Sequence, residues 1–367
     1  MKILIATNHS YMLYRFRREL IEALMREHEV VLSMPFVGHE DDFKAMGLLC
    51  IDTKLDRRSV DPVKDIRLAK AYRAMLDEIA PDIVITYSIK PNIYMGGACK
   101  ARGIPYFTNV QGLGTAFEKP LLSSVVTAMY RGALQKARTV FFENEENAQF
   151  FLHKNIISAR QMKILPGAGI NLDEYPYAPM QNDGVCSFLF VGRIMKEKGV
   201  DEFFAAAKTV KAEFGEKVAF DVVGFYEEAY KETVDQLVAD GIIKFHGFRT
   251  DMHPFYETAD CVVLPSYHEG MSNVLLEGAA TGRALITSDI PGCREAVEDG
   301  VSGYLCPAQD AEALTNFFRE FAGKTHVEQE QMGRCGRALI ERKFDKHIVV
   351  AQTMNGLGLA EAARSKA

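Results

Sequence analysis

Short apolar runs alternate with stretches of helical periodicity along most of the chain, and this alternation constrains the fold more than any other feature of the sequence. Each apolar run has the length of a buried strand, and the stretches between them place apolar residues three or four positions apart. Strands that alternate with helices form parallel sheets, because each helix returns the chain to the edge where the next strand begins. The expected strands are residues 3–6, 30–34, 82–86, 106–110, 140–142, 163–165, 187–191, 218–223, 243–245, 261–264 and 284–287.

Glycines and prolines interrupt the alternation between residues 167 and 184, a composition typical of a linker. We therefore expect a Rossmann-like N-terminal domain over residues 1–170, a linker at 171–184 and a second Rossmann-like domain over residues 185–345. Residues 346–367 are expected to form a helix that packs back on the first domain. The predicted fold class is α/β, with two doubly wound domains that face a central cleft. In such sheets, ligands bind beyond the carboxyl ends of the strands.

The composition excludes several other classes of protein. The chain has 367 residues, of which 48% are hydrophobic and 25% charged, which suffices for two domains with their own cores. Seven cysteines without C-x-x-C spacing predict reduced thiols, a cytoplasmic location and no zinc cluster. The sequence opens without a secretory signal pattern and has no run of about eighteen apolar residues, so we expect no membrane-spanning helix. The formal net charge of −6 argues against a nucleic-acid binder.

Residues 264–281 join an expected strand to an expected helix and carry the strongest functional signal. Ser272 and Asn273 are residues that cap a helix start. The N–H groups and dipole at such a start favour a phosphate or a sugar oxygen. Glu269 and Glu277 bracket the turn, and their carboxylates suit the hydroxyls of a nucleotide sugar. A single glutamate at a helix start more often stabilises the dipole alone, so the interpretation depends on a second site.

That second site is a loop with two cations in the same half of the chain. Arg193 and Lys198 follow the expected strand at 187–191, and Gly199 precedes an expected helix at 200–214. A planar guanidinium and a compact ammonium together suit the two phosphates of a diphosphate. A basic loop after a strand is by itself more often a solvated turn. The prediction of a nucleotide-sugar site therefore depends on both loops.

Four groups of residues in the second half form a pattern: Gly192-Arg193-x4-Lys198-Gly199, Phe245-His246-Gly247, Ala259-Asp260 and Pro265-Ser266-x2-Glu269-Gly270-x6-Glu277. This pattern resembles that of the retaining glycosyltransferases of family 4, which have the GT-B fold. Residues 87–94, 109–117, 141–145 and 288–295 are similar to a narrower bacterial branch of that family. The branch builds capsule, O-antigen and protein-linked glycans. It includes N-acetylgalactosaminyltransferases that act on undecaprenyl-diphosphate-linked sugars.

The resemblance implies roles for residues of the second half. Arg193 and Lys198 would hold the donor diphosphate and stabilise the leaving nucleotide, and Glu269 would bind the donor sugar, so these three are the expected catalytic residues. Glu277 would accept hydrogen bonds from the ribose. The other expected donor-binding residues are Phe248, Gly270, Met271, Ser272 and Asn273. The family uses no metal and no cofactor apart from the UDP-sugar co-substrate, and the sequence has no Asp-x-Asp motif.

The acceptor side is less clearly marked in the sequence. Many family members carry a histidine after the strand equivalent to 106–110, where this chain has Gln111. A glutamine can hydrogen-bond a sugar hydroxyl but cannot act as a base, so no general base is assigned. The expected acceptor-binding residues are His9, Tyr11, Arg15, Lys90 and Gln111.

The resemblance implies transfer of a sugar, an N-acetylhexosamine such as GalNAc, from a UDP-sugar to an undecaprenyl-diphosphate-linked saccharide. Because such an acceptor lies in the inner leaflet, the enzyme is expected on the inner face of the cell membrane, as a peripheral protein. A basic amphipathic stretch at residues 119–138 is by default more typical of a helix that faces the core, but the resemblance favours its contact with an anionic membrane. Its apolar stripe comprises Leu121, Leu122, Val125, Val126, Met129, Tyr130 and Leu134.

Three other functions compete with this one. A UDP-N-acetylglucosamine 2-epimerase shares the two-domain fold, but it needs acid–base carboxylates from the first domain, and the sequence offers no convincing set. A dinucleotide dehydrogenase would carry a G-x-G-x-x-G turn, which neither domain has. A non-catalytic nucleotide-sugar-binding protein stays open.

Overall fold

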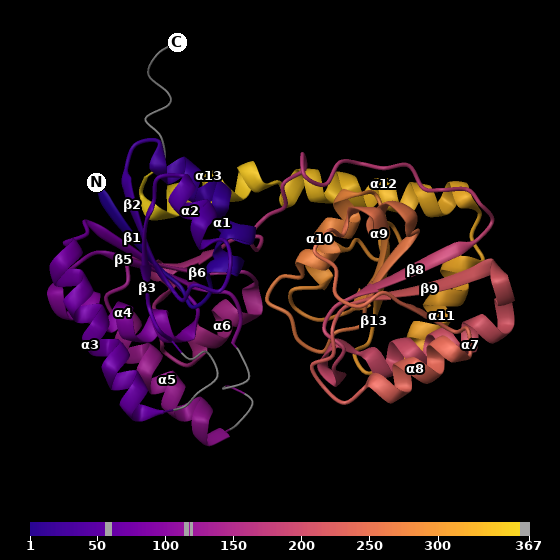
Figure 1. The fold of residues 1–367 in the computed structure, drawn as a ribbon, viewed down its shortest axis with the longest axis horizontal. Coiled ribbons are helices and arrows are strands. Elements are labelled where there is room, and N and C mark those ends of the chain that lie inside the picture. Colours follow the sequence, from indigo (N-terminus) through magenta and orange to yellow (C-terminus); the bar gives the residue numbers. More distant parts are fainter. Residues whose placement is uncertain (56–60, 114–116, 118–119, 360–367) are drawn as a thin grey trace, which may run out of the picture. The chain divides into compact units, whose positions relative to one another are not determined.

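The computed structural model describes residues 1–55, 61–113, 117 and 120–359, which divide into two compact units. The first unit comprises residues 1–168 together with the segment from residue 347 onward. The second unit comprises residues 169–346. Each unit is built on its own parallel sheet (Figure 1).

The first unit has a seven-stranded sheet in the order β3-β2-β1-β4-β5-β6-β7, with every neighbouring pair parallel. Its strands are β1 (Lys2–Ala6), β2 (Glu29–Met34), β3 (Leu49–Asp52), β4 (Ile83–Tyr87), β5 (Tyr106–Val110), β6 (Thr139–Phe142) and β7 (Met162–Ile164). The helices are α1 (Ser10–Met25), α2 (Glu40–Ala45), α3 (Pro62–Ile79), α4 (Ile89–Arg102), α5 (Pro120–Leu134), α6 (Glu145–His153) and α13 (Lys346–Leu357).

Helices cover both faces of this sheet because the side chains of each strand alternate between the faces. Leu4 and Ala6 of β1 belong to a core that includes residues of α3 to α6. Ile3 and Ile5 belong to a separate core with residues of α1, α2 and α13. A sheet buried on both faces explains why its strands read as continuous apolar runs.

The second unit has a six-stranded parallel sheet in the order β10-β9-β8-β11-β12-β13 around one aromatic-rich core. Its strands are β8 (Cys186–Val191), β9 (Val218–Val223), β10 (Lys244–Phe245), β11 (Cys261–Leu264), β12 (Ala284–Ser288) and β13 (Gly303–Cys306). The helices are α7 (Val200–Phe214), α8 (Lys231–Ala239), α9 (His253–Thr258), α10 (Asn273–Ala280), α11 (Ala311–Ala322) and α12 (His326–Lys343).

Both sheets have a point where the strand order changes direction. In the first unit the change falls between β1 and β4, and in the second between β8 and β11. The loops after these neighbouring strands leave in opposite directions and open a crevice, which is where doubly wound folds bind their ligands. The topology therefore marks one candidate crevice in each unit.

Residues 171–184, which the sequence predicts as a linker, contain no helix or strand and belong to the second unit. Tyr175 of this segment is buried, and the N–H of Ala178 donates to the carbonyl of Thr281. In the first unit, the side chain of Thr139 donates to the carbonyl of Gly356 in α13.

The apolar stripe of α5 faces the core, so the membrane-contact interpretation of this stripe is wrong for most of its members. Val126, Tyr130 and Leu134 are buried in the core, and Leu122 and Met129 pack against it. Among the members whose side chains the structure describes, Val125 is exposed. Leu121 and Lys119, at the start of the predicted stretch, lie outside the described side chains.

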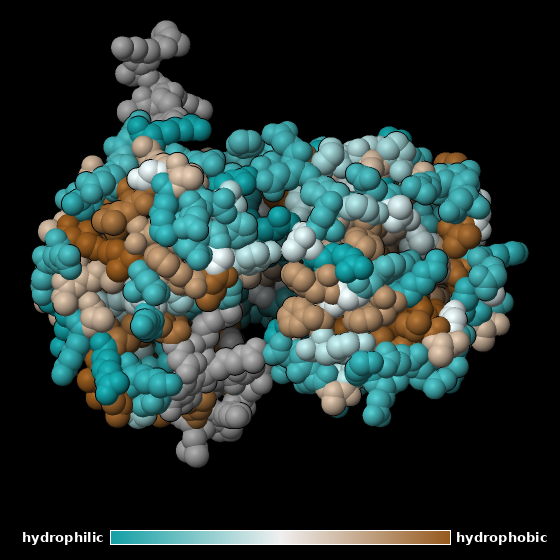
Figure 2. Space-filling view, in the orientation of Figure 1, coloured by the Kyte–Doolittle hydropathy of each residue, from teal (hydrophilic) through white to brown (hydrophobic). Residues whose placement is uncertain are grey.

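The surface gives no sign of a membrane-spanning element in the part of the chain that the structure describes. None of its helices combines the length and the apolar character needed to cross a bilayer. On the face shown in Figure 2, hydrophobic residues form separate patches among hydrophilic ones on each unit.

Candidate active site

The crevice of the second unit lies between two loops that are fixed to each other. The N–H of Tyr267 donates to the carbonyl of Glu197 over 2.8 Å, and the hydroxyl of Ser266 donates to the same carbonyl over 3.2 Å. Gly199 has a φ of +70°, and a Cβ built on it would lie 2.0 Å from the carbonyl oxygen of Pro265. Only glycine allows this approach.

A partly buried ion pair joins the two loops. Lys198 Nζ lies 2.5 Å from Glu269 Oε1, and the two side chains are 16% and 14% exposed. The sequence predicts both residues at one site, and the structure brings them into direct contact. Arg193, in the same loop as Lys198, has no hydrogen bond or ion pair within the described ranges, so its guanidinium can take an anionic ligand.

Helix α10 begins at the carboxyl end of β11, as the sequence predicts. Ser272 is its N-cap, and the Ser272 side chain accepts from the N–H of Leu275 over 3.4 Å. The N–H of Ser272 donates to the carbonyl of Gly292 over 2.9 Å. Gly292 has a φ of +82°, and a Cβ built on it would lie 2.4 Å from the carbonyl oxygen of Gly270. The loop after β12 therefore supports the turn that carries Glu269.

Glu277 lies in the second turn of α10 and is 8% exposed. The hydroxyl of Tyr256, from α9, donates to Glu277 Oε2 over 2.8 Å. This contact fixes the orientation of the carboxylate that the resemblance assigns to the ribose. Sequence analysis missed Tyr256, because a buried tyrosine within a helical pattern carries no signal of its partner.

Two exposed aromatic rings follow the neighbouring strands β9 and β10. Phe248 is 58% exposed and Phe225 is 44% exposed, and their ring centroids lie 6.0 Å apart. The resemblance predicts that Phe248 borders the uracil. Sequence analysis missed Phe225, although an aromatic residue directly after a strand and its glycine is a usable signal. Exposed aromatic rings provide a surface on which a base can pack.

The crevice of the first unit carries a strained residue. Ser88, between β4 and α4, has φ 73° and ψ 158°, a region that is nearly restricted to glycine. Its hydroxyl donates to Asn8 Oδ1, in the loop after β1, over 2.9 Å. Strain of this kind persists where the surroundings impose it, and it concentrates at functional sites. Sequence analysis did not single out either residue.

Three of the expected acceptor-binding residues, His9, Lys90 and Gln111, follow strands β1, β4 and β5 at the carboxyl end of this sheet. His9 is the N-cap of α1, and its ring centroid lies 6.3 Å from that of Tyr11. Lys90, in the first turn of α4, forms an ion pair of 2.8 Å with Asp65 of α3. Gln111 follows β5 directly and is half-buried, as is Arg15 on α1. Residues 114–116 of the segment that marks the bacterial branch lie outside the described residues.

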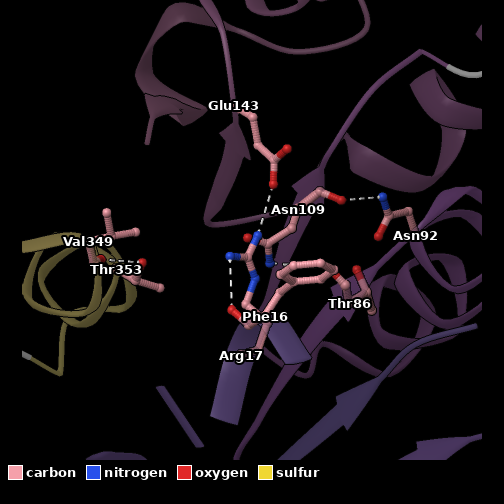
Figure 3. Close-up of polar contacts among 8 residues, drawn as sticks. All are labelled: Phe16, Arg17, Thr86, Asn92, Asn109, Glu143, Val349 and Thr353. Carbon is pink, nitrogen blue, oxygen red and sulfur yellow. Dashed lines mark hydrogen bonds and ion pairs between the residues drawn. The ribbon is translucent and has the colours of Figure 1, made fainter. Parts of the chain in front are cut away.

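A buried ion pair lies at the carboxyl end of the same sheet (Figure 3). Arg17 Nη2 of α1 donates to Glu143 Oε1, directly after β6, over 2.9 Å, and the Arg17 guanidinium lies 5.3 Å from the ring centroid of Tyr87. The two charged side chains are 9% and 12% exposed. Burial raises the pKa of the Glu143 carboxyl above its ordinary value of 4.5, and the Arg17 charge opposes that shift.

Arg17 is buried, although arginines on a helix that covers a sheet are mostly exposed. Beside the pair, the side-chain amide of Asn92 donates to the carbonyl of Asn109, and the amide of Asn109 donates to the carbonyl of Thr86 (Figure 3). These bonds tie α4 and β5 to β4 below the crevice.

Within the residues that the structure describes, no cluster of three or more His, Cys, Asp or Glu side chains could hold a metal ion. Cys99, Cys186, Cys261, Cys293 and Cys306 are buried free thiols. Metal-independent chemistry stays a prediction that an experiment must test.

Two families match the chain. Residues 2–144 match the family described as glycosyl transferase 4-like, and residues 186–322 match glycosyl transferases group 1. Each match falls within one of the two units, and the match over residues 186–322 includes every residue of the candidate donor site.

The chain is also similar to characterised bacterial proteins. It is 27% identical to N,N'-diacetylbacillosaminyl-diphospho-undecaprenol alpha-1,3-N-acetylgalactosaminyltransferase of Campylobacter jejuni subsp. jejuni serotype O:2, over 83% of this chain and 84% of the relative. It is 26% identical to the UDP-Gal:alpha-D-GlcNAc-diphosphoundecaprenol alpha-1,3-galactosyltransferase of Escherichia coli, over 71% of each chain.

A solved structure supports the fold assignment. The crystal structure of Anabaena HepE in complex with UDP and glucose superposes with a TM-score of 0.79 at 15% identity, covering 98% of this chain and 99% of that one. This likeness shows the shared GT-B fold. Together with the two family matches and the bacterial relatives, it shows that the chain is a glycosyltransferase with the GT-B fold, whose N-terminal half matches the glycosyl transferase 4-like family and whose C-terminal half matches glycosyl transferases group 1.

Proposed function

We propose that this glycosyltransferase moves an N-acetylhexosamine such as GalNAc from a UDP-sugar to an undecaprenyl-diphosphate-linked saccharide. The names of the Campylobacter jejuni and Escherichia coli relatives support an acceptor on undecaprenyl diphosphate. They differ in the sugar transferred, so the choice of GalNAc rests on the first relative. The product would enter capsule, O-antigen or another surface glycan.

The observation that carries this proposal is the Lys198–Glu269 pair at the strand-order change of the second unit. The pair sets an ammonium beside a carboxylate near the start of α10, an arrangement that suits a diphosphate and the hydroxyls of a sugar. The open Arg193 guanidinium adds a second cation to the same loop. A UDP-sugar has this combination of charge and hydroxyls.

The proposed reaction retains the configuration of the transferred sugar. The bond between the sugar C1 and the diphosphate oxygen breaks, and an acceptor hydroxyl oxygen bonds to C1 on the same face. The acceptor proton passes to the departing phosphate oxygen, so no protein base is required. Lys198, Arg193 and the N-terminus of α10 stabilise the negative charge that develops on UDP, as preorganised donors do in other enzymes. Glu277 holds the ribose, and no metal takes part.

We also propose that the enzyme works as a peripheral protein on the cytoplasmic face of the cell membrane. The argument comes from the acceptor, whose polyprenyl tail lies in the bilayer while its saccharide reaches the water phase. The α5 stripe does not support this proposal, because it packs in the core.

The test is release of UDP from a panel of UDP-sugars, with and without an undecaprenyl-diphosphate-linked saccharide. We expect acceptor-dependent UDP release with UDP-GalNAc, and a product whose new linkage is α. Conversion of UDP-N-acetylglucosamine without any acceptor would indicate an epimerase instead. Binding of a UDP-sugar without turnover under all conditions would indicate a nucleotide-sugar-binding protein.

A further inference from the structure

A cavity of about 810 Å³ opens in the first unit and plays no part in the donor site described above. Phe36 lies just after β2, Leu55 lies just after β3, and α3 forms one side of the cavity. Lys90, an expected acceptor-binding residue at the β1/β4 crevice, also contributes to its wall. The volume is within the range of about 300–1,000 Å³ that is typical of small-molecule sites.

The floor of the cavity is apolar. Leu68 and Met75 of α3 are buried there, and Phe36 and Leu55 are half-buried on the opposite wall. Ala71, between Leu68 and Met75 on the helix, is exposed toward solvent and leaves the space open. Such a floor gains free energy by covering an aliphatic ligand.

The rim of the cavity is cationic. Four basic side chains line it against two carboxylates: Lys54, Lys64, Arg67 and Lys90, with Asp52 and Asp65. Asp65 is already engaged by Lys90 in the 2.8 Å ion pair. An excess of positive charge above an apolar floor suits a ligand with an anionic group at one end and a hydrocarbon at the other.

The exposed surface of α3 repeats this combination of apolar and cationic side chains outside the cavity. Val63 and Ile66 are each 58% exposed, and they alternate along the first turns with the rim cations Lys64 and Arg67. A hydrocarbon that leaves the cavity along this helix would therefore meet further apolar side chains, and then the membrane from which it came.

We propose that this cavity binds the diphosphate and the first isoprene units of a polyprenyl diphosphate, with the cations on the diphosphate and the apolar floor on the isoprenes. This inference rests on the proposed function, in which a polyprenyl-diphosphate-linked saccharide is the acceptor. Lys90 borders both the cavity and the crevice at Ser88, so the saccharide would extend from the diphosphate into that crevice. The cavity thereby fixes the distance between the lipid end and the hydroxyl that is glycosylated.

The test uses farnesyl diphosphate as a soluble probe and the full chain, with excess UDP present to occupy the donor site. We expect saturable binding that is at least tenfold tighter than that of inorganic diphosphate or of farnesol. The double variant Lys64→Gln/Arg67→Gln should weaken it at least tenfold. The matched variant Lys70→Gln/Arg73→Gln removes the same charge from exposed positions of the same helix that do not line the cavity, and should change it less than twofold.

A third variant, Ala71→Phe, fills the cavity from an exposed position. It should weaken the binding of farnesyl diphosphate without affecting the binding of UDP. Equal losses in the two double variants, or equal affinity for inorganic and farnesyl diphosphate, would overturn the proposal in favour of general charge attraction or a simple anion site.

Transfer assays separate this proposal from the proposed function. An unchanged KM for an undecaprenyl-diphosphate-linked acceptor in Lys64→Gln/Arg67→Gln would reject the cavity and leave the function standing. Farnesyl diphosphate binding without transfer from any UDP-sugar would reject the function instead.

Discussion

Lys198 Nζ lies 2.5 Å from Glu269 Oε1, and this contact joins the loops that follow the neighbouring strands β8 and β11. Two residues with different expected ligands, a diphosphate and a sugar, are therefore partners of each other. A diphosphate that enters the crevice has to share the lysine with the carboxylate. The two residues can be separated experimentally, because UDP carries the diphosphate but not the sugar.

Replacing either member of this pair should lower transfer by about 10²–10³-fold, the usual cost of one preorganised donor to developing charge. The variants should differ in UDP binding measured by calorimetry. Lys198→Gln should weaken the binding of UDP, because the diphosphate loses a cationic partner. Glu269→Gln should leave UDP affinity unchanged or higher, because the lysine no longer has a competing carboxylate. Lys196→Gln, an exposed residue of the same loop, is the control. Equal loss of UDP affinity in both variants would reject the assigned roles.

The glycine at the loop after β12 gives a second prediction. Gly292→Ala would place a methyl group 2.4 Å from the carbonyl oxygen of Gly270, which forces the turn beside Glu269 to move. Gly300→Ala is the matched control, since it also has a positive φ but meets no atom within 4 Å. Both should lose about 1–2 kcal/mol of stability from the left-handed backbone. Only Gly292→Ala should also weaken UDP binding, by at least tenfold. Equal UDP affinities would show that the turn is not part of the site.

Metal removal is the third prediction. With Lys198 and Arg193 as the cations around the diphosphate, transfer should proceed at its full rate after dialysis against EDTA and in its presence. The measurement is the initial rate of UDP release before and after chelation, with Mg²⁺ and Mn²⁺ added back. A rate that falls on chelation and returns with one of the ions would mean that a metal takes part in the chemistry.

The sequence predicts the central strands well because each is buried on both faces. The strands at 218–223 and 261–264 are found with their predicted bounds. The edge strands β3 and β13 were not predicted. β3 ends in Asp52 and β13 begins with Gly303, so each strand contains only three apolar residues, and Leu49 of β3 is 58% exposed. Their strand geometry comes from pairing with β2 and β12, which a local pattern does not encode.

The candidate site likewise has parts that a local sequence pattern predicts and parts that only the fold reveals. The cap at Ser272 could be predicted because a helix start is a local pattern. The contacts of Glu277 with Tyr256 and of Glu143 with Arg17 join residues from distant parts of the chain, so only the fold reveals them. Arg17 shows the consequence, since an arginine among polar neighbours reads as solvated until a buried carboxylate is found opposite it.

The Arg17–Glu143 pair gives the fourth prediction, which concerns stability and pH. Arg17→Met leaves a buried carboxylate without its cation, which should cost about 3–5 kcal/mol of folding free energy at pH 7. The raised pKa of Glu143 should rise further, so the folded state would hold a proton that the unfolded state has released above pH 4.5. Stability of the variant should therefore fall as pH increases from 4.5 to 7. Urea unfolding at pH 5 and pH 7 measures this difference. The double variant Arg17→Met/Glu143→Gln carries no charge at the site and should regain much of the loss with no added pH dependence. A single variant that loses the same stability at both pH values would show that its defect is packing rather than charge.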